Sequence, residues 1–187
     1  MPTLPSGANV TLTKEIPDLK GVLAGIGWST DGDTALNETL TVAAILCDTD
    51  GRALSAEHVV FFNQPVSPDL STALVQCTST YDKAHFEIDF TLAPAQVARV
   101  ALVLYLNEGV GTRRTLGQLR RCHVRVLNLS SRSQIAGSAD LADTFGTETA
   151  TVLADVYRHD GGWKFKVTNQ GFSTGIDGVF DRYGVSR

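Results

Sequence analysis

The sequence predicts a mostly β protein, an antiparallel two-sheet β-sandwich with a short C-terminal helix. Short segments rich in β-branched and aromatic residues recur along the chain, and Gly, Asp, Asn or Pro separates them. Helical periodicity is nearly absent before the C-terminal segment. Because many short strands without helices between them cannot form βαβ units, they are expected to pack as two antiparallel sheets.

The first part of the chain contains candidate strands separated by turn residues. These strands are residues 8–13, 20–28, 39–48 and 57–63. The tetrapeptide at 48–51 ends in Gly51, which tolerates the positive φ angle of a tight turn. We therefore expect the chain to reverse directly after the third strand.

The later strands are predicted to be half buried or central. Residues 85–90 alternate, with Phe86, Ile88 and Phe90 on one face and polar side chains on the other. Residues 101–106 are apolar throughout, which is typical of a strand covered on both faces. Further strands are predicted at 122–127, 149–157 and 164–168, although the centre of the second of these segments also permits a helix.

Two segments have the spacing of short helices, residues 93–97 and 176–183. In the second, apolar side chains recur at helical intervals, so that one face of the helix is apolar. This C-terminal helix is expected to cap the sandwich.

Length and composition favour one folded domain spanning residues 1–187. The chain has 43% hydrophobic and 19% charged residues, which is typical of a globular protein rather than a disordered one. The longest apolar run, residues 100–106, is far shorter than the roughly 20 residues that cross a bilayer, so no transmembrane segment is expected. The N-terminus lacks the pattern of a secretory signal, and a cytoplasmic location is the default expectation.

No motif predicts catalysis. Residues 171–175 match the Gly-x-Ser-x-Gly nucleophile elbow, but in that hydrolase fold the base histidine follows the serine, and here no histidine follows His159. Because a serine without a general base is a weak nucleophile, a structural turn is expected instead. The four histidines have no metal-binding spacing and are expected at the surface or at strand edges. We therefore expect a protein that is not an enzyme.

Positive charge is concentrated between Gly109 and Ala139, a segment with arginines and no acidic residue, although the formal net charge of the chain is −4. Such asymmetry can steer an anionic partner to one face. The simpler alternative is a solvated face whose arginines pair with acidic residues elsewhere. No aromatic residues interleave for base stacking, so nucleic acid is not an expected partner. The candidate binding patch consists of Arg113, Arg114, Arg120, Arg121 and Arg125.

Several segments, taken together, follow the order of a known family. Residues 7–14 read Gly-Ala-Asn-Val-Thr-Leu-Thr-Lys, residues 25–28 read Gly-Ile-Gly-Trp, and residues 61–64 read Phe-Phe-Asn-Gln, followed by Ser-Pro-Asp at 67–69. The C-terminal third contributes the segments 117–118, 124–128, 147–150, 157–158, 163–166, 170–172 and 183–185. Over nearly the whole chain, this series resembles the TerD family of bacterial tellurium-resistance and stress-response proteins.

The resemblance implies a β-sandwich without known catalytic activity, which in many relatives binds calcium through two acid-rich loops. This sequence departs from the relatives in both loops. An ungapped register from Trp28 places Ser29 where relatives carry an Asp, and Thr39 and Thr41 where they carry Asp-x-Asp. The second acidic loop corresponds to residues 71–83, whose only acid is Asp82. Because the charge of a site controls calcium affinity, weak or absent calcium binding is expected, with no other cofactor.

An alternative keeps calcium by using shifted ligands. Of the family's ligand motif, Asn63 is retained with Asp69 nearby, and Asp31 and Asp33 form a separate acidic turn. The candidate metal ligands are therefore Asp31, Asp33, Asn63 and Asp69.

The resemblance also implies a biological setting. We expect a stress-response protein of the tellurium-resistance type that acts as an interaction module. Its implied partners are other TerD-like or stress-operon proteins, and its implied place is the cytoplasm, peripheral to the inner face of the membrane.

Overall fold

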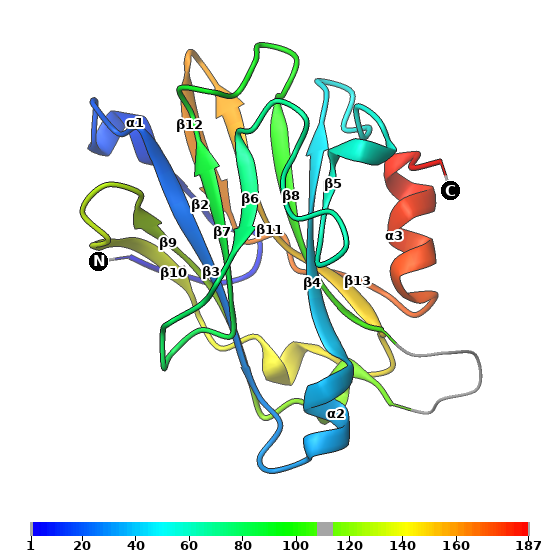
Figure 1. Cartoon of the computed structure of the whole chain (residues 1–187). Coiled ribbons are helices and arrows are strands. Elements are labelled where there is room, and N and C mark those ends of the chain that lie inside the picture. Colours follow the sequence, from blue (N-terminus) through cyan, green and yellow to red (C-terminus); the bar gives the residue numbers. More distant parts are fainter. Residues whose placement is uncertain (1, 108–113, 187) are drawn as a thin grey trace.

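The computed structural model describes residues 2–107 and 114–186, and over these residues the chain folds into two facing sheets (Figure 1). This arrangement confirms the mostly β class and the two-sheet architecture. Alternate side chains of both sheets point inward and form one large apolar core. None of the helices in the described ranges is long and apolar enough to cross a membrane.

The first sheet carries the polar site described below. Its strands lie in the order β1 (Thr3–Leu4), β10 (Gln134–Ser138), β9 (Arg121–Asn128), β3 (Gly21–Ser29), β7 (Ala84–Asp89) and β6 (Thr72–Val75). All of its neighbours pair antiparallel except β1 and β10, which run parallel. The expectation of purely antiparallel sheets is therefore wrong at this one edge.

The second sheet contains the strand predicted to be central. Its order is β2 (Asn9–Thr11), β12 (Gly162–Lys166), β11 (Ala150–His159), β8 (Arg99–Leu106), β4 (Leu40–Cys47) and β5 (Val59–Val60), and β13 (Gln170–Phe172) also pairs with β11. Strand β8 sends Leu102 and Leu104 into the core between the sheets. Its other face, with Val103 and Tyr105, packs in a separate apolar cluster. Both faces are covered, as the unbroken apolar pattern predicts.

Helix α3 (Gly175–Tyr183) covers the outer face of the second sheet (Figure 1). Val179 and Tyr183 of α3 are buried and belong to the same cluster as Val103. The predicted C-terminal cap is confirmed.

Three segments differ from the prediction. The first strand ends at Thr11, because Leu12–Glu15 turns into the short helix α1. The helix expected at 93–97 is absent from the described chain: Pro94 lacks an N–H and restricts the residue before it, and the segment forms turns closed by Val97 N–H on the Pro94 carbonyl. The strand expected at 57–63 contains the 3₁₀ turn Ala56–His58 and only two strand residues, those of β5.

Helix α2 (Thr34–Thr39), which the sequence pattern does not predict, lies at the end of the molecule where β3 leaves the first sheet (Figure 1). The carboxylate of Asp33 accepts a hydrogen bond from Leu36 N at 3.0 Å and caps its first turn. Leu36 is buried and anchors the helix to the core. Such a short helix is held by its cap and one apolar side chain, and so it leaves little periodic signal.

Candidate functional site: a buried carboxylate and an adjacent pocket

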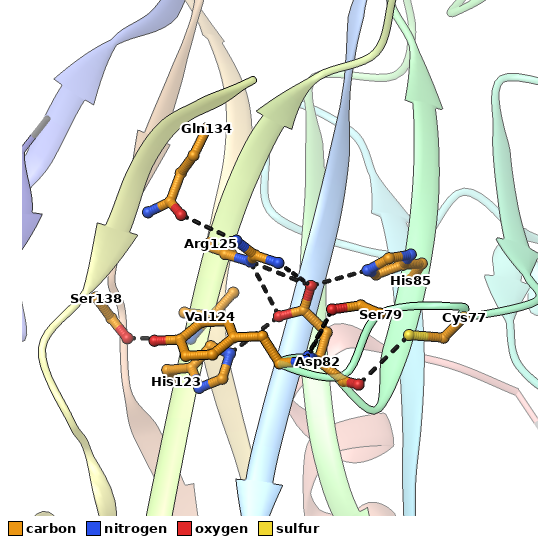
Figure 2. A network of polar contacts seen from close by, with 10 residues as sticks. Cys77, Ser79, Asp82, His85, His123, Val124, Arg125, Gln134 and Ser138 are labelled. Carbon is orange, nitrogen blue, oxygen red and sulfur yellow. Dashed lines mark hydrogen bonds and ion pairs between the residues drawn. The ribbon is translucent and has the colours of Figure 1, made fainter. Parts of the chain in front are cut away.

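Asp82 is a buried acid on the outer face of the first sheet, only 3% exposed. Its carboxylate accepts hydrogen bonds from His85 Nε2 at 2.8 Å and from His123 Nε2 at 2.9 Å. Arg125 donates from Nη2 to Oδ2 at 2.7 Å and from Nε to Oδ1 at 3.0 Å. Figure 2 shows the carboxylate enclosed between these three side chains. We call Asp82, His85, His123 and Arg125 the carboxylate cluster.

The strand registers explain why the cluster forms. Strands β7 and β9 flank β3, so their outward side chains converge over it. Gly25 of β3 pairs with His85 on one side and with Arg125 on the other, and Gly27 pairs with His123. The sequence pattern that turns the neighbouring apolar residues inward therefore turns these polar residues toward one point.

The two glycines provide the space for the cluster. A Cβ at Gly25 would lie 2.5 Å from Asp82 Oδ2. A Cβ at Gly27 would collide with the His123 ring and would lie 2.7 Å from the Tyr81 carbonyl oxygen. The cluster thus packs directly on the backbone of the Gly-Ile-Gly segment, where there is no room for a side chain at either glycine.

Neighbouring groups hold the cluster from outside. Ser79 Oγ accepts a hydrogen bond from Asp82 N at 3.0 Å and fixes the loop before β7. Gln134 of β10 accepts one from Arg125 Nη1 at 3.0 Å. The Tyr81 ring stacks on His123 at a centroid distance of 4.1 Å, and Arg125 Cζ lies 4.7 Å from the Tyr81 centroid. The cluster therefore links three strands and the loop at 76–83.

The cluster keeps Asp82 ionised. Burial alone would raise the pKa of its carboxyl group, but hydrogen bonds from His123, Arg125 and His85 and the charge of Arg125 outweigh burial and hold the pKa well below its usual range. An ionised carboxylate only accepts hydrogen bonds, so both imidazoles donate through Nε2–H. The arrangement is a satisfied ion cluster, and its carboxylate has no free oxygen to serve as a base.

A pocket of about 650 Å³ lies beside the cluster, where β3 ends. The side chains that line it are Trp28, Ser29, Thr30, Asp31, Thr34, Asn37, Thr80, Tyr81, Lys83, Arg121, Cys122, His123, Ser138 and Asp140, with Gly32. Its volume lies within the range typical of small-molecule sites.

The four candidate calcium ligands lie in two loops. Asp31 and Asp33 follow β3, where Asp31 lines the pocket and Asp33 caps α2. Asn63 and Asp69 lie between β5 and β6, where Asp69 Oδ1 accepts hydrogen bonds from Ser67 Oγ at 2.7 Å and from the Ser71 amide at 2.8 Å.

Among residues 2–107 and 114–186, no group of three or more His, Cys, Asp or Glu side chains is placed to hold a metal ion. Three of the four candidate ligands are aspartates and would form such a group if they met. The structure therefore does not bring their carboxylates together. The carboxylate cluster does not fit calcium either, because cationic and N–H donor groups already surround Asp82. Weak or absent calcium binding stays a prediction.

The candidate arginines have different surroundings. Arg125 belongs to the carboxylate cluster, Arg121 lines the pocket and Arg120 is exposed beside it. Arg114 is half buried, and Arg113 lies outside the described residues. The histidine interpretation was wrong for His85 and His123, which bind one carboxylate instead of lying free at strand edges. The available signal was the alternation of β7 and β9 on either side of two glycines.

Ser173 of the Gly-x-Ser-x-Gly segment lies in the connection between β13 and α3. His58 contacts Ser55 Oγ at 2.7 Å, and His159 lies 3.1 Å from Asp160. The other two histidines bind Asp82. In the described part of the chain, no histidine contacts Ser173.

Comparison with known proteins gives a consistent result. Residues 1–183 match the TerD domain family. The chain is 28% identical to tellurium resistance protein TerD of Serratia marcescens, covering 98% of this chain and 97% of that one. It is 27% identical to general stress protein 16U of Bacillus subtilis (strain 168), with the same coverage.

A solved structure has the same fold. It is a homologue of telluride resistance protein (TerD) from Streptomyces coelicolor A3(2), which superposes with a TM-score of 0.65 at 19% identity and covers 87% of this chain and 95% of that one. At this identity the likeness concerns the fold alone.

Proposed function

The chain belongs to the TerD domain family of tellurium-resistance and stress proteins, and from this premise we propose that it works as a non-catalytic interaction module in which the family's calcium-binding carboxylates are largely lost. Its proposed partners are other TerD-like or stress-operon proteins at the inner face of the membrane, and not nucleic acid.

The state of Asp82 carries the proposal. Asp82 is the only acid in the segment that corresponds to the relatives' second acidic loop, and it is enclosed by His85, His123 and Arg125. A guanidinium within 2.7 Å of the carboxylate supplies positive charge from the chain itself. Calcium would have to displace this cation, and the site would offer it too few ionised oxygens.

The surroundings of the nucleophilic side chains support a role without catalysis. Ser173 has no histidine beside it in the described chain, and a base within hydrogen-bond reach is what activates such a hydroxyl. Burial raises the pKa of the Cys47 thiol to about 12, so that the thiol stays protonated at neutral pH. Cys122 is fully buried, and burial raises the pKa of its thiol as well.

The loop between β5 and β6 supports an interaction role. It exposes Phe62, Val66 and Leu70, three large apolar side chains within nine residues of sequence. Large apolar side chains exposed on one loop can serve as contacts for a protein partner. This loop is the proposed contact region for partners.

Calcium titration by calorimetry, with melting curves in calcium and in chelator, tests the proposed loss of the calcium-binding carboxylates. We expect no heat of binding and equal melting temperatures, because a ligand raises the melting temperature only if it binds the folded state. A clear rise at micromolar calcium would instead favour a calcium module built on Asp31, Asp33, Asn63 and Asp69.

Capture of partner proteins from cells tests the proposed interaction role. A tagged chain is expected to retain other TerD-domain proteins of the same cell, and Phe62→Ser with Leu70→Ser should abolish their capture. Leu92→Ser is the matched control, because Leu92 is similarly exposed but lies in another loop. Equal loss with Leu92→Ser, or none with the double variant, would remove the β5–β6 loop from the proposal.

A further inference from the structure

The pocket beside the carboxylate cluster holds two cations that the fold does not use. Lys83 comes from the loop before β7, and its backbone N–H donates to the Ile26 carbonyl at 2.8 Å. Arg121 is the first residue of β9 and pairs with Ser29. Neither side chain makes an ion pair or hydrogen bond with any residue in 2–107 or 114–186, whereas the nearby Arg125 is fully engaged.

The two cations are placed to share one anion. Cys122 and Ala84 point into the core, so the preceding residues, Arg121 and Lys83, are on the opposite, outer face of the sheet. They flank the end of β3 from opposite sides. Arg121 pairs with Ser29, whereas Lys83 precedes the Ala84–Ile26 pair and so lies level with Gly27. Two strand spacings across the sheet and two residues along it separate the two backbones by about 12 Å, which two long cationic side chains can bridge through one phosphate.

The other charged groups of the pocket suit hydroxyl donors. Asp140 Oδ1 accepts hydrogen bonds from the backbone N–H groups of Cys122 and Ala142, both at 3.0 Å, whereas its Oδ2 has no hydrogen-bond partner among the described residues. The Asp31 carboxylate makes no hydrogen bond or ion pair with the described residues, and its exposed side chain is free to accept from a ligand. A pocket with two free cations and free carboxylate oxygens matches a ligand that carries both an anion and hydroxyl groups.

Two rings and an amide complete the pocket. The Trp28 indole N–H donates to Asn37 Oδ1 at 3.0 Å, which orients the Asn37 side chain and leaves its amide N–H groups as donors. Tyr81 is 59% exposed and is steadied by its stacking on His123. The Tyr81 ring offers flat apolar surface to a sugar or a base, whereas the Trp28 ring packs partly against the core.

We propose that this pocket binds a sugar phosphate, free or as part of a nucleotide, with the phosphate between Lys83 and Arg121 and the sugar hydroxyls on Asp31. The assignment does not depend on the interaction role proposed above, since it uses none of the residues of the β5–β6 loop.

Calorimetry with ribose 5-phosphate, AMP, ribose and inorganic phosphate tests the proposal on the intact chain. We expect the two phosphorylated sugars to bind, ribose to give no heat, and inorganic phosphate to bind at least about tenfold more weakly. Tighter binding of AMP would identify a nucleotide, and equal or tighter binding of ribose 5-phosphate a free sugar phosphate. Lack of binding by both, or equal affinity for inorganic phosphate, would overturn the proposal.

Charge-reversal variants locate the site. Lys83→Glu and Arg121→Glu should each weaken ribose 5-phosphate binding by about tenfold or more, as expected for lost charge-assisted hydrogen bonds. Arg120→Glu is the matched control, because Arg120 is exposed next to Arg121 but does not line the pocket. Equal weakening in all three variants would overturn the assignment.

A second readout does not need variants. The chain has two tryptophans, of which Trp28 lines the pocket and Trp163 is buried against Phe90 elsewhere. In a ¹⁵N-correlated spectrum, ribose 5-phosphate should shift the indole signal of Trp28 and leave that of Trp163 in place. An unshifted Trp28 signal at saturating ligand would count against this pocket.

Discussion

Gly25 lies directly beneath the carboxylate of Asp82, so close that a Cβ at Gly25 would come within 2.5 Å of Oδ2. The carboxylate cannot move aside cheaply, because His85, His123 and Arg125 hold both of its oxygens. The ion cluster therefore requires that Gly25 of β3 has no side chain, because the cluster lies over this position and joins residues of the neighbouring strands β7 and β9.

Gly25→Ala should destabilise the fold by about 1 to 3 kcal/mol, the usual cost of forcing extra volume into a packed site. Urea denaturation measures the change. Gly146→Ala is the control, because a Cβ there would meet only Glu148 Oε2 at an ordinary 3.8 Å. A control variant as unstable as Gly25→Ala would mean that the Asp82 contact is not the cause.

Asp82→Asn should cost about 3 kcal/mol or more of unfolding free energy. The amide keeps the shape but leaves Arg125 with its guanidinium largely buried and no counter-charge, and breaking one side of a buried ion pair is strongly destabilising. Glu87→Gln on β7, the strand that follows the loop of Asp82, is the comparison. Its partner Arg132 lies 3.4 Å away, and both side chains are substantially exposed, so about 0 to 1 kcal/mol is expected. Equal losses of unfolding free energy in the two variants would show that burial does not increase the cost of breaking the Asp82 ion pair.

The sequence predicted the strands whose apolar residues follow a clear pattern. The core strands β3, β4, β7, β8 and β9 lie close to their predicted bounds, because each alternates or is apolar throughout. The short strands β1 and β6, at the two edges of the first sheet, and β10, next to β1, were missed. Their few residues carry no clear period, and pairing with a neighbour decides their conformation.

The site was predictable only in part. Alternation placed His85 and His123 on the outer faces of their strands, but it could not show that Asp82, in an irregular loop, folds back between them. That meeting depends on the register of β7 and β9 against β3 and on two glycines in the strand between them. Registers are set by tertiary packing, which one sequence does not reveal.

The three thiols should differ in reactivity. Cys47 and Cys122 are completely buried, and burial raises the pKa of both thiols, whereas Cys77 is half buried in the loop at 76–83. With a thiol reagent at mildly alkaline pH, the native protein should show one reactive thiol, and Cys77→Ser should remove it. Three thiols should react after unfolding in urea. Rapid reaction of two or more thiols in the native Cys77→Ser variant would contradict the buried positions.

The stability of the protein should fall in acid partly through Asp82. The folded-state pKa of its carboxyl group is lowered from its usual value of 3.8, so its stabilisation is complete above about pH 5 and is lost as the pH falls toward the folded-state pKa. Below pH 4 the unfolded chain takes up a proton at Asp82 that the native cluster resists, which favours unfolding. Asp82→Asn has no such proton to gain.

The unfolding free energies of the wild type and Asp82→Asn should therefore converge between pH 4 and pH 2.5. Urea titrations at several pH values measure the difference, in which the common contributions of the other carboxyl groups cancel. Parallel curves for the two proteins would mean that the cluster does not lower the pKa of Asp82, and the ion pair with Arg125 would then have to be much weaker than its geometry indicates.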